Sequence, residues 1–253
     1  MVCKMSSDDV KNYFNMHDHD YGHDKDPSFY IDLSNFVHRI KRSDGLRILD
    51  VGCGSGSFIK ALIECGTTAH FVGIDLSEKM IERAKSKLKD HDVELYVMDV
   101  NQIRRHIPIK YNVIHLGSVL HHLIGRTQGQ SKKLAEETIK ALVDMLENQG
   151  VLIIEEIFYH SYIIPTLTSK FIFYGLKLLN RTRLDMSNYI PQVQLGLEVS
   201  FFSEKELRKL LQKYSNNVIN FRRESWPIPK VYRYFLLKDC GHMTYVATRN
   251  QTP

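Results

Sequence analysis

The stretch that decides the fold reads Asp50-Val51-Gly52-Cys53-Gly54-Ser55-Gly56. It follows a short apolar run, residues 46–49, and precedes a helix-like segment, residues 57–64. An acid at the end of a predicted strand is therefore followed by a glycine turn that opens a helix. Glycine has no Cβ and tolerates positive φ, and the first helical turn has free N–H donors, so a ligand can approach this backbone closely.

The glycine spacing distinguishes two kinds of cofactor. A dinucleotide fingerprint reads G-x-G-x-x-G, but here the third glycine, Gly56, comes one residue early and Ser57 takes its position. Asp50 is also not part of that fingerprint. The pattern D-x-G-x-G-x-G resembles the first motif of the class I S-adenosylmethionine-dependent methyltransferases. A glycine turn alone is a weak signal, so the elements that follow it must support the resemblance.

The second predicted strand, residues 70–74, ends in Asp75-Leu76. Asp75 follows Asp50 at the distance of one strand–helix–strand unit, where an acid can accept both hydroxyls of a ribose. The alternative is that Asp75 or Ser77 caps the next helix, and Ser77 is the better cap because an acidic residue follows it in the first turn.

The third predicted strand, residues 93–98, ends in Asp99-Val100, and the fourth, residues 111–116, is followed by Gly117. The resemblance implies that Asp99 accepts from the adenine amino group, although an ordinary loop aspartate is the alternative. A helix over 132–147, a turn at 148–150 and a strand over 151–156 follow, so the resemblance covers residues 45–157. It assigns cofactor binding to ten residues: Asp50, Gly52, Gly54, Gly56, Asp75, Leu76, Asp99, Val100, Gly117 and Tyr21.

The resemblance predicts an α/β fold, with a seven-stranded, doubly wound, Rossmann-like sheet whose last β-hairpin is reversed. We expect four parts: an N-terminal helical cap (1–44), an S-adenosylmethionine-binding core (45–157), a helical insertion acting as an acceptor lid (158–200), and a C-terminal completion of the sheet (201–253). The last two strands are expected near 218–224 and 242–248, after a helix that begins with the Ser203/Glu206 capping box.

Two segments outside the core leave alternatives open. Residues 17–26 hold three histidines and four aspartates, which could hold a metal, but so polar a loop favours a solvated lid, and we predict no metal site. The resemblance makes Tyr21 and Tyr13 candidates to cover the methionine end of the cofactor. The predicted helix 165–180 is apolar almost all round, which suits a lid, a membrane interface, a second subunit or a buried element.

The catalytic candidates are His121 and His122, just past the fourth strand at the carboxyl edge where ligands of open α/β sheets bind. Histidine suits proton transfer at neutral pH, and one of the two is expected to face the acceptor. Glu155 and Glu156, after the fifth strand, are further candidates, of which at most one should face the pocket because neighbouring strand residues alternate.

Composition limits the class of protein. The 253 residues are 43% hydrophobic, enough for a core, with no apolar run long enough to span a membrane and no signal-peptide pattern at the N-terminus. The four scattered cysteines suggest free thiols in a reducing cytoplasm. From residue 158 onward there are 14 Lys and Arg against 6 Asp and Glu, and 16 of the aromatic residues, which suits an anionic, flat or greasy acceptor.

We therefore predict a cytoplasmic enzyme that transfers a methyl group from S-adenosylmethionine, by in-line displacement, to a small-molecule or lipid-like acceptor, with a histidine as general base. Peripheral membrane contact and a homodimer stay open as partners, whereas DNA is not expected. The basic, aromatic C-terminal part keeps RNA methylation as an alternative, although no Asn/Asp-Pro-Pro-Tyr/Phe signature follows the fourth strand. A non-catalytic cofactor-binding or partner-activating subunit is the alternative from another class.

Overall fold

The computed structural model describes residues 6–17, 27–40, 45–107, 109–164, 166–182, 197–228 and 237–249. Its helices and strands in chain order are α1 (Ser7–Met16), α2 (Pro27–His38), β1 (Arg47–Val51), α3 (Ser57–Glu64), β2 (His70–Asp75), α4 (Glu78–Lys87), β3 (Val93–Val97), α5 (Ile103–His106), β4 (Tyr111–Gly117), α6 (Gln128–Asp144), β5 (Leu146–Ser161), α7 (Leu167–Thr182), α8 (Glu204–Leu211), β6 (Ser215–Ser225) and β7 (Leu237–Arg249). Short 3₁₀ helices span Val100–Gln102 and Leu120–His122.

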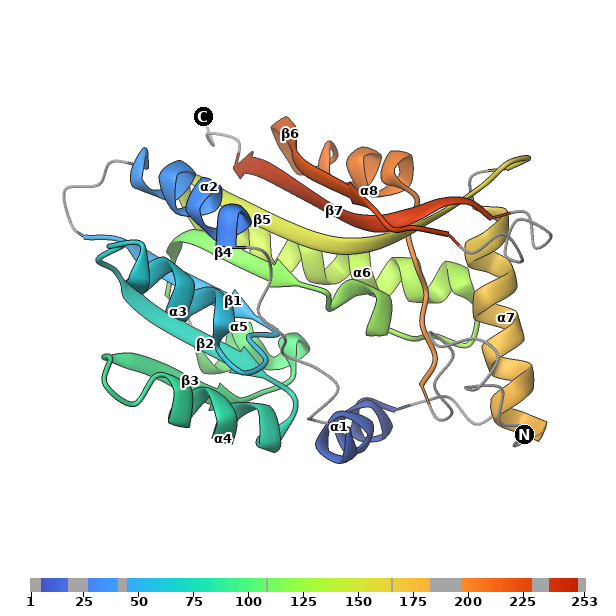
Figure 1. Ribbon diagram of the computed structural model, residues 1–253, viewed down its shortest axis with the longest axis horizontal. Coiled ribbons are helices and arrows are strands. Elements are labelled where there is room, and N and C mark those ends of the chain that lie inside the picture. The colour runs from blue at the N-terminus through green and yellow to red at the C-terminus, as the bar shows by residue number, and fades with distance from the viewer. Residues whose placement is uncertain are drawn as a thin grey trace.

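The strands of the described residues form one seven-stranded sheet in the order β3-β2-β1-β4-β5-β7-β6 (Figure 1). Strands β1 to β5 run parallel, whereas β7 is antiparallel to both β5 and β6. The predicted fold class, including the reversed last hairpin, is confirmed. The central strand β4 is buried along residues 111–116, as expected for a parallel strand covered on both faces.

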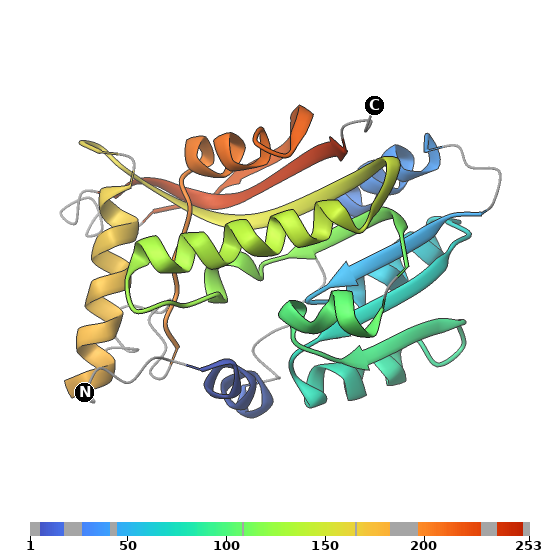
Figure 2. The ribbon, with the colours of Figure 1, turned by 180° about the vertical axis from the view of Figure 1, so that it is seen from behind.

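Helices cover the two faces of the sheet and enclose one apolar layer each (Figures 1 and 2). On one face α2 and α3 bury Leu33, Phe58 and Leu62 against the sheet, and on the other α6 and α8 bury Ile139 and Leu207. Burying a large apolar side chain contributes about 1.5–3 kcal/mol, so these two layers stabilise the sheet whose carboxyl edge carries the site.

Capping side chains begin several of the helices. Ser77 caps α4 by accepting from the Met80 amide, and Ser203 and Glu206 form the predicted capping box of α8. Helix α6 begins four residues earlier than predicted because Thr127 accepts from the Gln130 amide. The turn predicted at 148–150 is instead an irregularity within β5, where the register against β4 shifts and Gln149 takes φ 61°.

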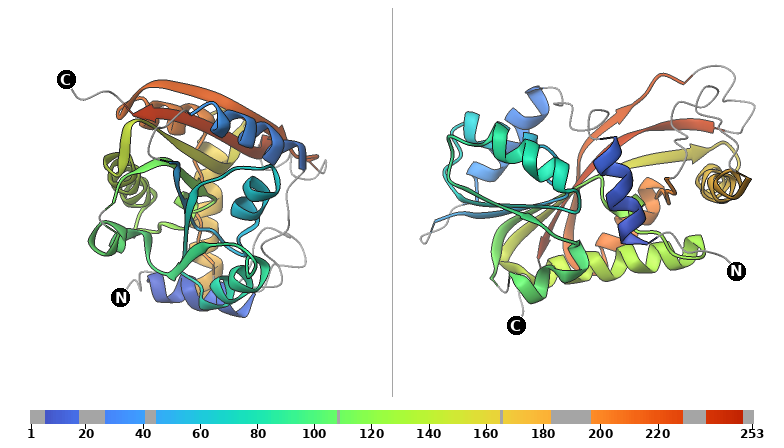
Figure 3. Two further views of the ribbon diagram at one scale, coloured as in Figure 1. Left: turned by 90° about the vertical axis from the view of Figure 1, so that its left-hand side faces the viewer. Right: turned by 90° about the horizontal axis from the view of Figure 1, so that it is seen from below.

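Helix α7, which was predicted to be apolar almost all round, exposes one part of its apolar surface and buries another. Phe171, Tyr174 and Leu178 are 62%, 53% and 62% exposed, whereas Phe173 and Leu176 are buried. In the right-hand view of Figure 3, α7 is seen nearly end-on at the edge of the molecule.

One side chain of α7 explains this orientation. Lys177 Nζ donates to the carbonyl oxygens of Gly125 and Arg126 and lies 3.3 Å from Glu198 Oε2, so it ties one side of the helix to the neighbouring loops. Within the described residues, no helix is both long and apolar enough to cross a membrane.

Candidate functional site

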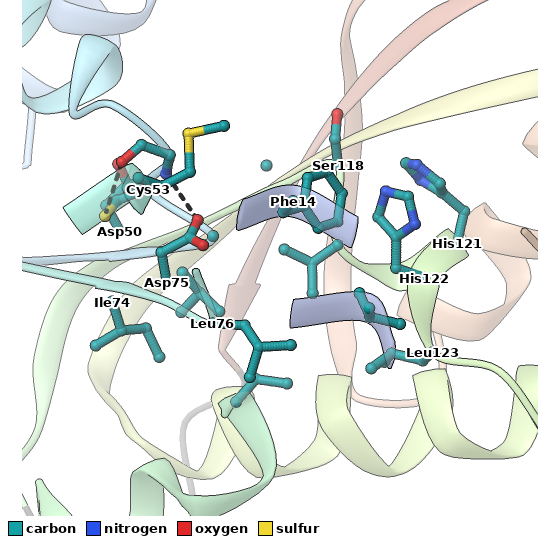
Figure 4. Close-up of a pocket in the computed structure, with 18 of the residues that line it drawn as sticks. Phe14, Asp50, Cys53, Ile74, Asp75, Leu76, Ser118, His121, His122 and Leu123 are labelled. Carbon is teal, nitrogen blue, oxygen red and sulfur yellow. Dashed lines mark hydrogen bonds between the residues drawn. The ribbon is translucent and has the colours of Figure 1, made fainter. Parts of the chain in front are cut away.

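A cavity of about 720 Å³ opens at the carboxyl edge of the sheet, between the glycine turn, α1 and the 3₁₀ helix Leu120–His122 (Figure 4). Most of the predicted site residues share its wall: Asp50, Gly52, Gly54, Asp75, Leu76, Asp99, Val100, Gly117, His121 and His122. Two predicted residues do not. Tyr21 falls outside the described residues, together with 18–26 of the His/Asp-rich segment, and Gly56 is absent from the wall.

The glycine turn is a tight backbone cradle. Gly52 has φ 71°, and a Cβ there would lie 2.3 Å from Val119 Cγ2. Gly54 has φ 52° with open space around it, so its missing side chain leaves room in the cavity. Gly56 serves packing instead, because a Cβ there would lie 2.7 Å from Leu88 Cδ1 of the chain beyond α4. Only the first two glycines therefore bear directly on a ligand.

Asp75, the last residue of β2, is hydrogen-bonded to the glycine turn. Its Oδ2 accepts from the Gly54 amide at 2.9 Å, and its Oδ1 accepts from the Ser77 amide at 2.8 Å. Burial raises the pKa of Asp75 to about 6, although the two backbone amides act in the opposite direction. The same burial, with Asp50 and Asp75 nearby, raises the pKa of the Cys53 thiol, so Cys53 is neutral and is no nucleophile.

Asp99 lies where β3 leads into the 3₁₀ helix Val100–Gln102. Its Oδ1 accepts from the backbone amide of Asn101 at 2.9 Å and from the Asn101 side chain at 2.7 Å. Asp99 thus caps this short helix, as the loop-aspartate alternative expected, and it also lines the cavity, as the cofactor role requires.

A buried polar row runs across β1, β4 and β5. Nδ1 of His115 lies 2.7 Å from Oδ1 of Asp50, and Nε2 of His115 lies 2.9 Å from Oε1 of Glu155. The ring of Phe58 stacks on His115 at 3.9 Å. The other oxygen of Asp50, Oδ2, is buried and has no hydrogen-bond partner among the described residues. Sequence reasoning did not find His115, because a histidine inside an apolar strand resembles a core residue.

The two predicted histidines both line the cavity, although we expected one of them there. Nδ1 of His121 lies 2.6 Å from Oε2 of Glu156, whose Oε1 accepts from the Leu120 amide at 2.7 Å. His122 lies between His121 and Phe14, with ring centroids 4.0 and 5.0 Å away (Figure 4). Of the two glutamates, Glu155 lines the cavity and Glu156 does not, as strand alternation predicts.

The two histidines differ electrostatically. Burial, and to a smaller extent the neighbouring His121, lowers the pKa of His122 well below its ordinary value. Nδ1 of His122 is buried without a hydrogen-bond partner among the described residues. His122 is therefore neutral at pH 7, whereas His121 has a carboxylate that fixes its ring and its tautomer.

Helix α1 covers the cavity, and Phe14 rather than Tyr13 faces it. Tyr13 was the alternative candidate, but it is 3% exposed and packs in the cluster of apolar residues beneath α7. Neighbouring helical residues point about 100° apart, so an error of one residue changes the face.

Ser118, another residue that sequence reasoning missed, lines the cavity with φ 57°, a conformation that non-glycine residues seldom adopt outside functional or strained sites.

Apolar side chains make up much of the remaining cavity wall, which also includes His242. They are Val10, Phe14, Val119, Leu123, Ile124, Leu134 and Ile157. The described part of the insertion, 158–164, 166–182 and 197–200, contributes no residue to this wall, so among the described residues α1 is its cover. Trp226 packs in the cluster beneath α7 and does not line the cavity.

Known proteins resemble this chain in both sequence and fold. The sequence model of a family described as "Methyltransferase domain" matches residues 42–214. A tRNA (guanine-N(7)-)-methyltransferase of Prochlorococcus marinus is 26% identical over 137 residues, covering 49% of this chain and 64% of the relative. A ubiquinone biosynthesis O-methyltransferase of Nitrosospira multiformis is 26% identical over 165 residues, covering 64% of this chain and 63% of the relative. The chain thus spans less than two thirds of each of these relatives.

A solved structure has the same fold. The magnesium protoporphyrin IX methyltransferase of Synechocystis, crystallised with bound SAH, superposes with a TM-score of 0.58 at 19% identity. The match covers 96% of this chain and 99% of that one.

Proposed function

Because the chain belongs to the class I S-adenosylmethionine-dependent methyltransferase family, we propose that it transfers a methyl group from S-adenosylmethionine to a hydroxyl of an apolar, small or lipid-like acceptor. When bound, the cofactor supplies an electrophilic methyl on a sulfonium that is already a good leaving group. The chain's own task is to orient the acceptor and to take its proton.

The donors and acceptors of the cavity fit this cofactor. Asp75 offers a carboxylate for the two ribose hydroxyls, and Asp99 offers one for the adenine amino group. The unpartnered Oδ2 of Asp50 offers an acceptor to the amino group at the methionine end, and Gly52 and Gly54 leave the backbone open between them. Leu76, Val100 and Gly117 border the same space and would make apolar and backbone contacts.

The observation that carries the proposed chemistry is the pair formed by His121 and Glu156. A carboxylate only accepts, so Nδ1 of His121 donates to Glu156 and Nε2 keeps its lone pair. A base held by a third group in this way is the arrangement that enzymes use to deprotonate a hydroxyl. His121 takes the acceptor's proton at Nε2, and Glu156 stabilises the imidazolium that results. His122 packs beside the base and shapes the wall.

The apolar part of the cavity wall supports the acceptor class. With Phe14, Leu123 and Ile124 in the same wall as the histidines, an acceptor with a large apolar surface would gain by leaving water. A flat or aliphatic molecule with one hydroxyl would bury apolar surface and present the hydroxyl to His121.

A lipid surface is the partner that fits the exposed side of the insertion. Phe171 and Tyr174 on α7, and Tyr162, Ile163 and Ile164 in the preceding turn, are each more than half exposed. Residues 157–184 contain no acid, and Lys170 on α7 is exposed, which suits anionic headgroups. We therefore favour peripheral membrane contact over a homodimer.

Methyl transfer from radiolabelled S-adenosylmethionine tests the proposal. We expect label to enter an organic extract of apolar hydroxyl compounds or lipids, and not purified tRNA. Label in tRNA alone would replace this proposal by RNA methylation, the class of the Prochlorococcus relative. Cofactor binding without label in any acceptor would favour a non-catalytic subunit.

A further inference from the structure

Three buried polar side chains form a hydrogen-bonded row beside the glycine turn. Asp50, His115 and Glu155 are 0%, 5% and 2% exposed, and they come from the neighbouring strands β1, β4 and β5. Asp50 is opposite His115 in the parallel register, and Glu155 is opposite Gly117, two residues further along β4. Because side chains two residues apart on a strand share a face, the three groups point into the same side of the sheet.

The hydrogen bonds fix the number of protons in the row. Carboxylates only accept, so the contacts from His115 to Asp50 at 2.7 Å and to Glu155 at 2.9 Å need one proton each. An imidazolium supplies both. Two carboxylates and one imidazolium then sum to a single net negative charge at the cavity wall.

The surroundings of the ring favour the charged form. Phe58 stacks on His115 with an interplanar angle of 21°, and an aromatic face attracts a cation. Gly117 makes room for the ring, since a Cβ there would lie 2.9 Å from Cε1 of His115. Of the ionisable groups nearby, burial keeps the Cys53 thiol neutral, and Asp75 is held by the amides of Gly54 and Ser77.

The net negative charge of the row lies at the cavity wall, where it would attract a cationic group of a ligand. Oδ2 of Asp50 is buried without a partner among the described residues, and all three groups line the cavity. A buried carboxylate oxygen without a donor is costly, so a ligand donor is expected there. We propose that His115 is a positioning residue: as an imidazolium anchored by Glu155, it fixes the Asp50 carboxylate so that Oδ2 binds the cationic amino group of the cofactor.

This inference rests on the proposed cofactor. Two ligands distinguish binding of the cofactor as a whole from binding of its amino group. S-adenosylhomocysteine has the amino group, whereas 5′-methylthioadenosine has the nucleoside but no amino acid. Two variants separate the two hydrogen bonds: in His115→Asn the amide nitrogen replaces Nδ1 and reaches Asp50, and in His115→Gln it replaces Nε2 and reaches Glu155.

By calorimetry, His115→Gln should bind S-adenosylhomocysteine at least about tenfold more weakly, the loss expected when a charged hydrogen-bond partner is no longer held in place. His115→Asn should retain more of the affinity, and 5′-methylthioadenosine should bind wild type and both variants alike. Equal losses for both ligands, or unchanged S-adenosylhomocysteine affinity in His115→Gln, would overturn the inference. If wild type bound neither ligand, the proposed cofactor itself would be wrong.

A measurement on the wild-type protein needs no variant to fold. In ¹⁵N-labelled protein, both ring nitrogens of His115 should carry a proton at pH 7.5, as their nitrogen chemical shifts report. A neutral ring with one protonated nitrogen would contradict the imidazolium row.

Discussion

Nδ1 of His121 lies 2.6 Å from Oε2 of Glu156, although the two residues are 35 positions apart in the chain. The pair joins the turn after β4 to the neighbouring strand β5, and the second oxygen of Glu156 holds the Leu120 amide of the same turn. The base and the backbone that carries it are therefore fixed by one carboxylate.

The first prediction concerns the base. His121→Asn should slow methyl transfer by roughly 10²–10⁴-fold, the usual contribution of a general base, with cofactor affinity nearly unchanged. Glu156→Gln should slow it less, because the amide oxygen can still accept from Nδ1 but no longer stabilises a cation.

His122→Asn is the matched control for that prediction, since it changes the adjacent ring in the same cavity. Single-turnover assays with a labelled cofactor would measure all three variants. A larger loss in His122→Asn than in His121→Asn would transfer the role to His122.

The second prediction is a pH dependence set by Asp75, whose pKa is raised by burial to about 6. Ribose hydroxyls that donate to the carboxylate favour its ionised form, so binding should release a proton. The affinity for S-adenosylhomocysteine should therefore fall as the pH drops through 6, approaching about tenfold per pH unit, and stay constant above it. Calorimetry from pH 5 to 8 would measure this.

Asp75→Asn supplies the control for the pH dependence. This variant should bind more weakly at pH 7.5, with a flat profile, because its side chain does not titrate. The stability of the ligand-free protein is a second test. The raised pKa of Asp75 stabilises the folded state at low pH, and this contribution is lost as the pH rises from about 4 through 6. A wild-type affinity profile that is flat through pH 6 would disagree with the assigned role of Asp75.

The third prediction compares two glycines of the turn. Gly52→Ala should lower the melting temperature clearly, because its Cβ would overlap Val119 and φ is 71°. Gly54→Ala meets open space and should cost only the strain of its φ of 52°, of order 1 kcal/mol, while filling part of the cofactor's space. Thermal unfolding and calorimetry together should show Gly52→Ala losing stability and Gly54→Ala losing mainly affinity. The reverse order would mean that the turn does not approach the ligand.

The fourth prediction concerns the exposed face of α7. Phe171→Ser combined with Tyr174→Ser should lower co-sedimentation with anionic vesicles by at least about tenfold, since each large apolar side chain contributes roughly 1.5–3 kcal/mol on burial. Ile219→Ser on β6 removes an apolar side chain that is 44% exposed elsewhere and should have no effect. If the wild-type protein ignored vesicles and were dimeric by light scattering, the face would be a subunit interface.

The fold and most of the cofactor wall could be predicted because they depend on short-range patterns. Asp50, Asp75 and Asp99 each lie at or just past the carboxyl end of a strand, and parallel strands bring these ends to one edge. The hydrogen-bonded pairs of the site, by contrast, depend on which residues of neighbouring strands lie opposite one another. That Glu156 reaches His121, and that His115 reaches both Asp50 and Glu155, follows from the register of β1, β4 and β5, which no local pattern encodes.

The orientation of α7 was equally hidden. Apolar residues surround the helix, so periodicity could not tell which side is buried. The buried side is the one that carries Phe173 and Leu176. Lys177 helps to fix it, because its ammonium donates to the carbonyl oxygens of Gly125 and Arg126, some 50 residues earlier in the chain.

The central claim is that the cavity binds the cofactor of the methyltransferase family, and calorimetry of the purified protein tests it most directly. S-adenosylmethionine and S-adenosylhomocysteine should each bind at one site per chain, and Asp75→Ala should weaken binding by about 1.5–3 kcal/mol, the cost of removing a charged hydrogen-bond partner. NAD and ATP should give no heat of binding. Tight NAD binding, with neither sulfur-containing nucleoside bound, would contradict the account.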